Sequence, residues 1–380
     1  MIALITAFYD ENYRYLEVQI ARSLLNLGYE VQVFSTNRAL PNCDVPLEQS
    51  QHQKVAVWRS QRNVRFGDSV FSFDTHKVCI RPEEYRAVIV LAPNFIFPFQ
   101  LLRKFKRSGV QVISFFSDHE HNMTKIWYRR LLNKYLYPRV SKMSQSLALA
   151  TPDTNRMLLN YGVEGDVLAE KVDHVGLLVS NDSVQFDPVE GLSLDEDRKW
   201  LVCITQVRGR KAVKEFLKQV DIFLSANPEW SLFFGGFLEN AESKEALEYA
   251  ASLGSYTRMR LVGRLQQDEV FHLFTQAERV LFFSATISVQ QAMLLGCPVL
   301  LPKSRTLGAL LQEPENGFYY GDYQEADEDA DYPYPHLLQG LADALERSKS
   351  HLFSRKELQQ RNKNLSGEWQ LGRLLDCHEN

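Results

Sequence analysis

The sequence predicts an α/β fold made of two doubly wound parallel sheets, and three observations support this. Apolar strand-like runs alternate with amphipathic helical patterns along the chain, as in parallel β-α-β units with right-handed crossovers. The alternation restarts after a polar, acidic connector near residues 180–198. The length of 380 residues fits two domains, each with its own core. We therefore expect one sheet on each side of the connector.

In the first half, short apolar runs that match buried β-strands predict the sheet. They are Ala3–Phe8, Glu30–Ser35, Val55–Arg59, Ala87–Leu91, Val110–Phe116, Leu147–Ala150 and Val172–Val175. A helix is expected from Tyr15 to Leu27, because Gly28 follows it and glycine commonly ends helices. A second amphipathic helix is expected over Phe97–Ser108.

The second half repeats this pattern. Its predicted strands are Trp200–Ile204, Trp230–Gly235, Arg258–Val262, Arg279–Phe283 and Pro298–Leu301. A helix over Lys214–Leu224 ends before an Ala-Asn-Pro turn. The acidic segment Asp322–Asp331 is interpreted as a solvated loop, and one helical stretch from Leu338 to about Leu375 closes the chain.

Composition is that of an ordinary globular protein, with 45% hydrophobic, 12% aromatic and 24% charged residues. No apolar run is long enough to span a bilayer, and the apolar start, Met1–Ile5, is interpreted as a strand and not as a signal peptide. Five dispersed cysteines without CxxC spacing predict reduced thiols and no structural zinc, as in the cytoplasm. The five are Cys43, Cys79, Cys203, Cys297 and Cys377.

Charge is distributed unevenly along the chain. Residues 1–178 hold 22 Lys and Arg against 17 Asp and Glu, and the remainder holds 21 against 30. The basic residues cluster in 101–143, where there are ten Lys and Arg and two acidic residues. This asymmetry indicates that the first half meets something anionic.

A basic, aromatic helix is predicted over Trp127–Met143. Trp127, Leu131 and Tyr135 would lie on one side and the cations Arg129, Arg130 and Lys134 on the other. Such a helix suits an anionic membrane surface, met through Lys125–Lys142. It also suits a packing helix whose charges face water. Nucleic acid is not expected, because no recognised binding module accompanies the patch.

Residues 280–302 carry the most informative motif. A buried strand leads into a hydroxyl-rich loop, Ser284–Ser288, and then into a short helix containing Gln291 that stops at Gly296. Such β-loop-α-β units bind ligands where strand ends meet helix starts. We therefore expect Ser284, Thr286, Ser288 and Gln291 to line a bound molecule.

Two further loops follow predicted strands. Thr205–Lys211 places Arg208, Arg210 and Lys211 within four residues, and fixed cations of this kind stabilise a leaving group that gains negative charge. Ser117–Asn122 holds Asp118, His119 and His121, which suit an active site, an ordinary polar loop or metal ligands.

Taken in order, these motifs resemble those of GT-B glycosyltransferases, specifically the retaining family-4, glycogen-synthase-like enzymes. Gly28-Tyr29-Glu30-Val31, the pair Gly235-Gly236, Gly263-Arg264 and the turn Glu315-Asn316-Gly317 also match family positions. Gln291 stands where relatives usually carry a glutamate, and a second glutamate before it is missing. The resemblance implies two Rossmann-like domains facing a central cleft.

The resemblance also implies a domain plan and an activity. Residues 1–178 would bind the acceptor, 179–350 the nucleotide sugar, and a C-terminal helix in 351–380 would pack back on the first domain. The implied reaction is retaining, metal-independent transfer of a hexose from a UDP- or GDP-linked sugar to a glycan, glycolipid or other acceptor, with no further cofactor. The chain would be cytoplasmic, or peripheral to the inner face of the membrane.

Site residues follow from the same resemblance. Asp118, His119 and His121 would lie at the reacting centre, and Tyr13, Tyr15 and Glu17 would contact the acceptor. The donor would be held by Arg208, Arg210, Lys211, Gly236, Gly263, Arg264, Ser284, Thr286, Ser288 and Gln291. Two alternatives stay open: a non-catalytic GT-B protein that binds a sugar nucleotide or a protein partner, and a sugar-nucleotide epimerase.

Overall fold

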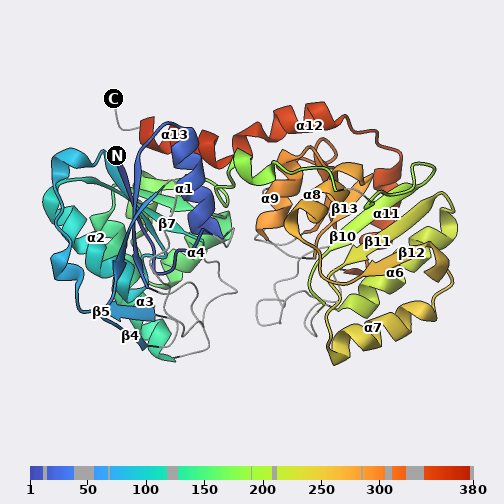
Figure 1. The fold of residues 1–380 in the computed structure, drawn as a ribbon, viewed down its shortest axis with the longest axis horizontal. Helices are drawn as coiled ribbons and strands as arrows, with labels where there is room; N and C mark the ends of the chain where they lie inside the picture. The colour runs from blue at the N-terminus through green and yellow to red at the C-terminus, as the bar shows by residue number, and fades with distance from the viewer. Residues whose placement is uncertain are drawn as a thin grey trace. The chain divides into compact units, whose positions relative to one another are not determined.

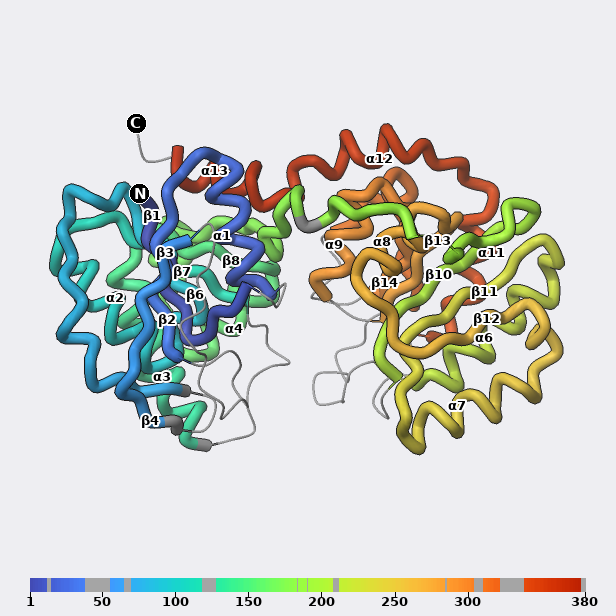
Figure 2. Tube along the Cα trace, in the orientation of Figure 1, coloured from blue at the N-terminus to red at the C-terminus, as the bar shows by residue number. Residues whose placement is uncertain are grey.

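The chain forms two compact units (Figure 1, Figure 2) in a computed structural model. The structure describes residues 1–11, 15–37, 55–66, 69–117, 127–189, 191–207, 212–283, 286–303, 310–321 and 338–376. The first unit comprises Met1–Ser183 and Leu365–Asn380, and the second comprises Val184–Asn364. The chain therefore leaves the first unit once and returns to it at its end.

A seven-stranded sheet, parallel throughout, forms the centre of the first unit, in the order β3-β2-β1-β6-β7-β8-β9. The strands are β1 Ile2–Ile5, β2 Val31–Thr36, β3 Ala56–Ser60, β6 Ala87–Leu91, β7 Gln111–Phe116, β8 Ser146–Leu149 and β9 Val172–His174. An antiparallel hairpin, β4 Asn63–Phe66 with β5 Ser69–Ser72, follows β3 and was not expected from the sequence.

Helices cover both faces of this sheet. They are α1 Leu16–Asn26, α2 Ile96–Ser108, α3 Trp127–Met143, α4 Pro152–Asn160, α5 Gly165–Lys171 and α13 Gly367–Asp376. Alternate residues of β1 point to opposite faces: Ile2 and Leu4 pack with α1 and α13, whereas Ala3 and Ile5 pack with α2 and α3. The sheet is therefore buried on both faces, which explains its continuously apolar strands.

Close approach between α13 and its neighbours depends on one glycine. A Cβ on Gly367 would lie 2.3 Å from the hydroxyl oxygen of Ser23 and 2.7 Å from the carbonyl oxygen of Leu178. Leu371 and Leu374 then bury themselves in the same core as α1. The C-terminal helix is thus an integral layer of the first unit.

The second unit is built on a six-stranded sheet, also parallel throughout, in the order β12-β11-β10-β13-β14-β15. Its strands are β10 Lys199–Ile204, β11 Trp230–Gly235, β12 Met259–Val262, β13 Arg279–Leu281, β14 Val299–Pro302 and β15 Gly317–Tyr320. Its helices are α6 Val213–Ala226, α7 Ala241–Ala251, α8 Gln267–Gln276, α9 Ile287–Leu294, α11 Leu341–Lys349 and α12 Arg355–Asn362.

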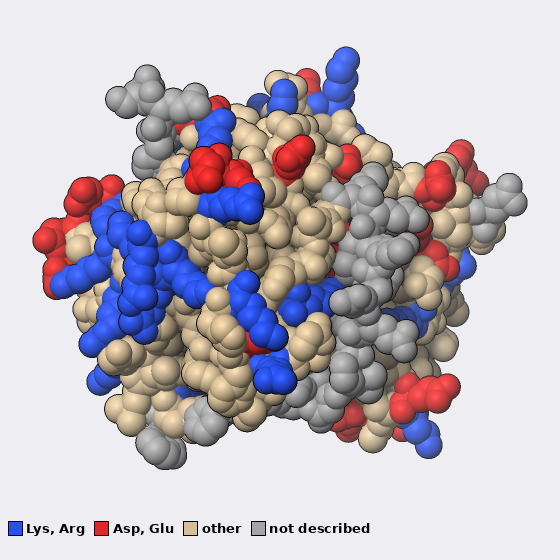
Figure 3. Space-filling model, turned by 60° about the vertical axis from the view of Figure 1, so that its left-hand side comes forward, with Lys and Arg blue, Asp and Glu red and all other residues tan. Residues whose placement is uncertain are grey.

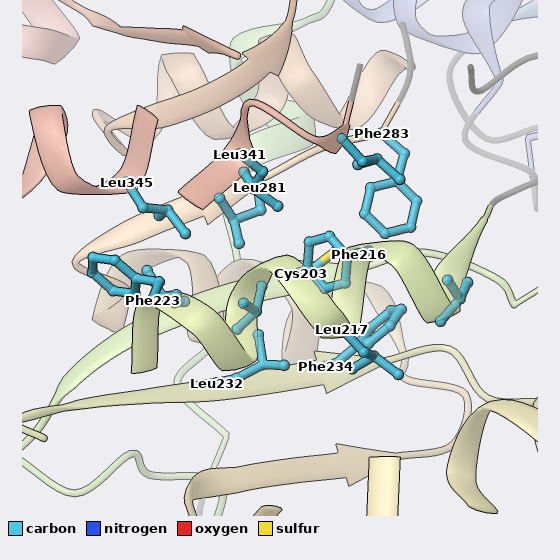
Figure 4. Close-up of a cluster of buried hydrophobic side chains, with 14 of the residues drawn as sticks. Cys203, Phe216, Leu217, Phe223, Leu232, Phe234, Leu281, Phe283, Leu341 and Leu345 are labelled. Atoms are coloured by element: carbon cyan, nitrogen blue, oxygen red, sulfur yellow. The ribbon is translucent and has the colours of Figure 1, made fainter. Parts of the chain in front are cut away.

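An aromatic core fills one face of this second sheet (Figure 4). Phe216 of α6 lies between Phe234 of β11 and Phe283, with ring centroids 5.4 Å and 4.5 Å away. Leu341 and Leu345 of α11 complete the cluster. This packing fixes the ends of β10, β11 and β13 relative to one another.

Two details differ from the sequence-based expectation. The last helical stretch is three separate helices, because the chain turns after Lys349 and again near residues 363–365. The strand expected to reach Phe283 ends at Leu281. The five thiols were expected to be reduced, and Cys79, Cys203 and Cys297 are free, while Cys43 and Cys377 lie outside the described residues. Of the helices described, none combines the length and apolarity that crossing a bilayer requires.

Candidate functional site

Both sheets have a point where the strand order reverses, between β1 and β6 in the first unit and between β10 and β13 in the second. Doubly wound sheets bind ligands beside such points, at the carboxyl ends of the strands. The loops that follow these four strands are therefore candidate ligand-binding loops.

In the second unit, the loops after β10, β11 and β12 are joined by backbone hydrogen bonds. The Thr205 N–H donates to the Gly235 carbonyl at 2.9 Å, and the Val207 N–H donates to the Gly236 carbonyl at 3.0 Å. The Gly236 N–H donates to the Gly263 carbonyl at 2.8 Å. Gly236 and Gly263, both predicted donor residues, are thus brought together beside the segment that leads into residues 208–211.

The two glycines differ in the space around their α-carbons. Gly236 has φ +114°, and a Cβ there would clash with the Thr205 backbone. Gly263 and the neighbouring Arg264 are exposed, and a Cβ on Gly263 would meet only Phe237, at 3.7 Å. Packing explains the glycine at 236, whereas the backbone at 263 is open to an approaching molecule.

Helix α9 places three of the predicted donor residues near its start. Thr286 is exposed at the N-cap, and its side chain makes no capping hydrogen bond. The first N–H groups of α9 therefore keep capacity to bind an anion or a hydroxyl. Ser288 is half-buried, and Gln291 is 2% exposed.

A tyrosine that the sequence analysis missed supports this region. The Tyr320 hydroxyl in β15 donates to the Phe282 carbonyl at 2.6 Å, just after β13. Asn240 similarly donates from its side-chain amide to the Val207 carbonyl at 3.3 Å. Neither residue carries a sequence signal beyond its position near a strand end.

Eight of the predicted site residues lie outside the described residues. They are Tyr13, Asp118, His119, His121, Arg208, Arg210, Lys211 and Ser284. Among the residues that the structure does describe, no group of three His, Cys, Asp or Glu side chains is placed to hold a metal ion. The roles assigned to these eight stay predictions.

In the first unit, the two described acceptor candidates lie at the start of α1. Tyr15 is the exposed N-cap residue, and Glu17 is half-buried in the first turn. Burial raises the pKa of Glu17 to about 7, although a hydrogen bond from its own backbone N–H opposes the shift. Burial also raises the pKa of Tyr9, whose hydroxyl donates to Glu11 Oε1 at 3.3 Å.

A cavity of about 360 Å³ lies along α1 and was not foreseen. Residues on one face of the helix and Val55 form its wall, and polar groups from two other segments complete it. It is lined by Tyr9, Glu11, Val18, Ala21, Arg22, Leu25, Asn26, Val55 and Asp182. The apolar wall suits a carbon skeleton, and the polar groups suit hydroxyls, as in small-molecule pockets generally. Arg22 is its cation and has no ion-pair partner in the described part of the chain.

A buried arginine holds the loop after β1 in place beside this cavity. Arg59, at the end of β3, donates from one guanidinium nitrogen to the Tyr9 carbonyl at 2.9 Å and to the Thr36 carbonyl at 3.1 Å. Burial lowers its pKa, and the carboxylate of Asp10 opposes that shift. Arg59 therefore joins the ends of β2 and β3 to the loop after β1 through one side chain.

No family model matches the sequence, and no curated protein matches it. Solved structures match it over almost its whole length. HepE of Anabaena, solved with UDP, has a TM-score of 0.66 and 12% identity, over 99% of this chain and 100% of that chain. A glycosyltransferase from Rickettsia africae has a TM-score of 0.65 and 12% identity, over 99% and 97%.

An enzyme of another reaction class matches as well. The UDP-GlcNAc 2-epimerase of Methanocaldococcus jannaschii has a TM-score of 0.54 and 16% identity, over 99% of this chain and 100% of that chain. These likenesses and the two sheet orders show that the chain has the GT-B fold, with two Rossmann-like domains. The fold expected from the sequence is confirmed, and the family-4 subtype stays a prediction.

Proposed function

We propose that this protein is a glycosyltransferase that moves a hexose from a nucleoside diphosphate sugar, UDP- or GDP-linked, to an acceptor hydroxyl. The observation that carries the proposal is the whole-chain likeness to HepE, a protein solved with UDP and with UDP-glucose. The joined loops after β10, β11 and β12 support it, because they lie at the strand ends where this fold binds nucleotides.

The proposed reaction forms a bond between an acceptor oxygen and the anomeric carbon of the donor. The bond from that carbon to the diphosphate breaks, and the nucleoside diphosphate leaves with the electron pair. Arg208, Arg210 and Lys211 would stabilise its growing negative charge, so the mechanism needs no metal ion. Asp118, His119 and His121 would lie at the reacting centre, where this group would take up the proton of the acceptor hydroxyl. The anomeric configuration would be retained.

The donor is proposed to lie between the two sets of loops in the second unit. Ser284, Thr286, Ser288 and Gln291 would contact the sugar, and Gly236, Gly263 and Arg264 would border the nucleotide. The Gln291 amide can hydrogen-bond hydroxyl groups but supplies no negative charge. Apart from this nucleotide sugar as a co-substrate, the reaction uses no cofactor.

The acceptor is proposed to bind the first unit near the start of α1. Tyr13, Tyr15 and Glu17 would contact it, and the cavity along α1 offers an apolar wall with polar groups around it. A glycan or glycolipid acceptor fits this combination, as in polysaccharide or glycolipid assembly. We place the protein in the cytoplasm, peripheral to the inner face of the membrane through Lys125–Lys142.

Two other functions share this fold. The likeness to the Methanocaldococcus jannaschii epimerase supports inversion of a sugar nucleotide at C2. The change to Gln291 and the absence of the second donor-loop glutamate favour a protein that binds a sugar nucleotide or a protein partner without turnover.

Calorimetry with UDP-, GDP- and ADP-sugars, followed by analysis of the products, separates these functions. Binding followed by release of the nucleotide with an unchanged sugar supports transfer. A C2-inverted product supports epimerisation, and binding without any product supports the non-catalytic alternative. The donor assignment fails if none of the nucleotide sugars binds.

A further inference from the structure

The β4–β5 hairpin, α2 and α3 form part of the outer layer over one face of the first sheet, which α4 and α5 also cover. The Gln100 amide group in α2 accepts from the Ser72 N–H at 3.1 Å and donates to the Ser72 carbonyl at 3.0 Å, which joins the hairpin to α2. Arg129 of α3 lies over the Phe95 ring at the start of α2, 4.9 Å from its centroid. The three elements therefore form a continuous layer within the first unit.

The hairpin exposes apolar side chains on its outer side. Val64 and Phe71 lie opposite each other in the antiparallel register and are 54% and 38% exposed. Phe73 is 58% exposed, and its ring centroid lies 5.0 Å from that of Phe71. Val70, on the other side of the hairpin, packs against Ala7 and Phe8 in the interior. One side thus anchors the hairpin while the other presents a cluster of apolar side chains to solvent.

A buried carboxylate keeps this hairpin in shape. Asp74, only 4% exposed, accepts hydrogen bonds from the Ser60 hydroxyl at 2.5 Å and the Ser72 hydroxyl at 2.7 Å. It also accepts from the backbone N–H groups of Gln61 at 2.9 Å and Arg62 at 3.3 Å. These bonds join the two ends of the hairpin, so the apolar cluster is presented by a fixed structure.

All the charged residues of α2 and α3 are cations, since their sequences contain no Asp or Glu. Their exposed cations are Arg103, Lys106, Arg107, Arg130, Lys134, Arg139 and Lys142. Figure 3 shows Lys and Arg gathered on this side of the molecule. In the described residues, Arg103, Lys106, Arg107 and Lys134 make no ion pair, so their charge is available to a partner.

Helix α3 exposes both apolar and cationic side chains. Leu131 and Tyr135 were expected on one side of the helix and Arg130 and Lys134 on the other, and all four side chains are exposed. Leu131 is 59% exposed and Tyr135 is 50% exposed. The exposed surface of α3 therefore mixes large apolar groups with cations.

We propose that the β4–β5 hairpin inserts Val64, Phe71 and Phe73 into the surface of an anionic lipid bilayer. The cations of α2 and α3 would meet the lipid headgroups at the same time. A bilayer interface accepts both kinds of group together, because aromatic and aliphatic side chains leave water while Lys and Arg attract the anionic surface. A soluble polyanion would use the cations and leave the apolar cluster in water. The inference rests on the proposed function in one respect: both assume that the acceptor lies at the membrane.

Sedimentation with lipid vesicles tests the proposal, using the full chain without sugar nucleotide. We expect binding to vesicles of phosphatidylcholine with phosphatidylglycerol, little binding to phosphatidylcholine alone, and weakening by salt. Replacing Phe71 and Phe73 together by Ser should weaken binding about tenfold or more, because their burial is lost. Lys134→Ala should weaken it roughly fivefold. Leu352→Ser and Lys244→Ala, matched exposed positions in the second unit, should leave binding unchanged.

A fluorescence measurement tests insertion directly. Phe73→Trp should gain quenching by brominated lipids relative to the unaltered protein, and Leu352→Trp should not. The proposal is overturned if the protein ignores anionic vesicles, or if the paired Phe variant binds them unchanged. Equal binding to heparin by the unaltered protein and the paired Phe variant, without any vesicle binding, would assign the surface to a soluble polyanion. Calorimetry with UDP on the same variants separates this outcome from failure of the donor site.

Discussion

A Cβ atom added to Gly236 would lie 2.1 Å from the carbonyl oxygen of Thr205. The loop after β11 therefore lies directly against the loop after β10, with no room for a side chain between them. Because Thr205 leads into the segment with the predicted diphosphate-binding cations, this contact links the glycine at 236 to the proposed donor site.

Replacing Gly236 by Ala should destabilise the second unit by about 2–4 kcal/mol, from the clash and from the positive φ. The main chain from Thr205 to Val207 must shift to relieve the contact, so UDP binding should also weaken. Thermal unfolding and calorimetry measure the two effects. Gly254→Ala is the control, because no atom lies within 4 Å of a Cβ there. Equal stability of the two variants would contradict the prediction.

Lys211→Ala should abolish donor turnover and weaken UDP binding about 10- to 100-fold, because a charged hydrogen bond to the diphosphate is lost. Lys218→Ala provides the control, since Lys218 is an exposed lysine in the α6 helix that follows. Unchanged activity of the Lys211 variant would remove Lys211 from the site.

The stability of the first unit should depend on the protonation of Glu17. Its pKa of about 7 lies above the ordinary value of 4.5, so the folded protein favours the neutral carboxyl group. Below about pH 4.5, Glu17 is neutral in both the folded and the unfolded chain, so it does not lower the free energy of unfolding. As the pH rises from 4.5 to 7, the unfolded chain ionises more readily and the free energy of unfolding falls. Glu17→Gln should gain about 1–3 kcal/mol above neutral pH and nothing near pH 4. Urea unfolding at both pH values tests this, and an equal gain at both would refute it.

Asp74 should show the opposite pH dependence. Burial alone would raise its pKa, but hydrogen bonds from Ser60, Ser72 and two backbone N–H groups lower it from 3.8 to about 2. Its stabilisation is therefore complete above about pH 4 and is lost as the pH falls toward 2. Asp74→Asn should cost about 2 kcal/mol at neutral pH and speed hydrogen exchange at Gln61 and Arg62. Glu83→Gln, at an exposed carboxylate, should change neither.

The carboxylate of Glu368 fastens α13 to the rest of the first unit. It accepts from the Asn26 amide at 2.9 Å, from the Ser180 hydroxyl at 2.8 Å and from the Asn181 N–H at 3.1 Å. Glu368→Ala should cost about 1–3 kcal/mol, because these donors lose their shared acceptor. Glu357→Ala in α12 is the matched control. A thermal scan in which both variants unfold alike would rule out this role.

The sequence predicted the buried strands well, because strands covered on both faces are continuously apolar. Ala87–Leu91 and Trp230–Gly235 have the predicted bounds. The hairpin was missed because its apolar residues Val64 and Phe71 face solvent and not the core. The alternation of apolar and polar residues that marks a half-buried strand is therefore absent. Its shape depends on Asp74, which lies beyond both strands.

The candidate site was predictable where a loop follows a strand, as at Gly236 and Gly263. The cavity along α1 was not, because Glu11 and Asp182 meet only in the folded chain. Glu17 was named from its position, but its raised pKa depends on burial, which a single sequence does not specify. Local patterns thus located the loops, and tertiary packing determined the chemistry of the groups in them.

Because Leu365–Asn380 belongs to the first unit, the start of the chain cannot reach its final form early in synthesis. The core that α1 shares with Leu371 and Leu374 stays incomplete until the whole second unit has left the ribosome. At ordinary translation rates that delay is on the order of ten seconds or more. During this delay, the surface of α1 that α13 later covers exposes apolar side chains, the kind of surface that chaperones recognise. The first unit is therefore the first to be synthesised and the last to complete its folding.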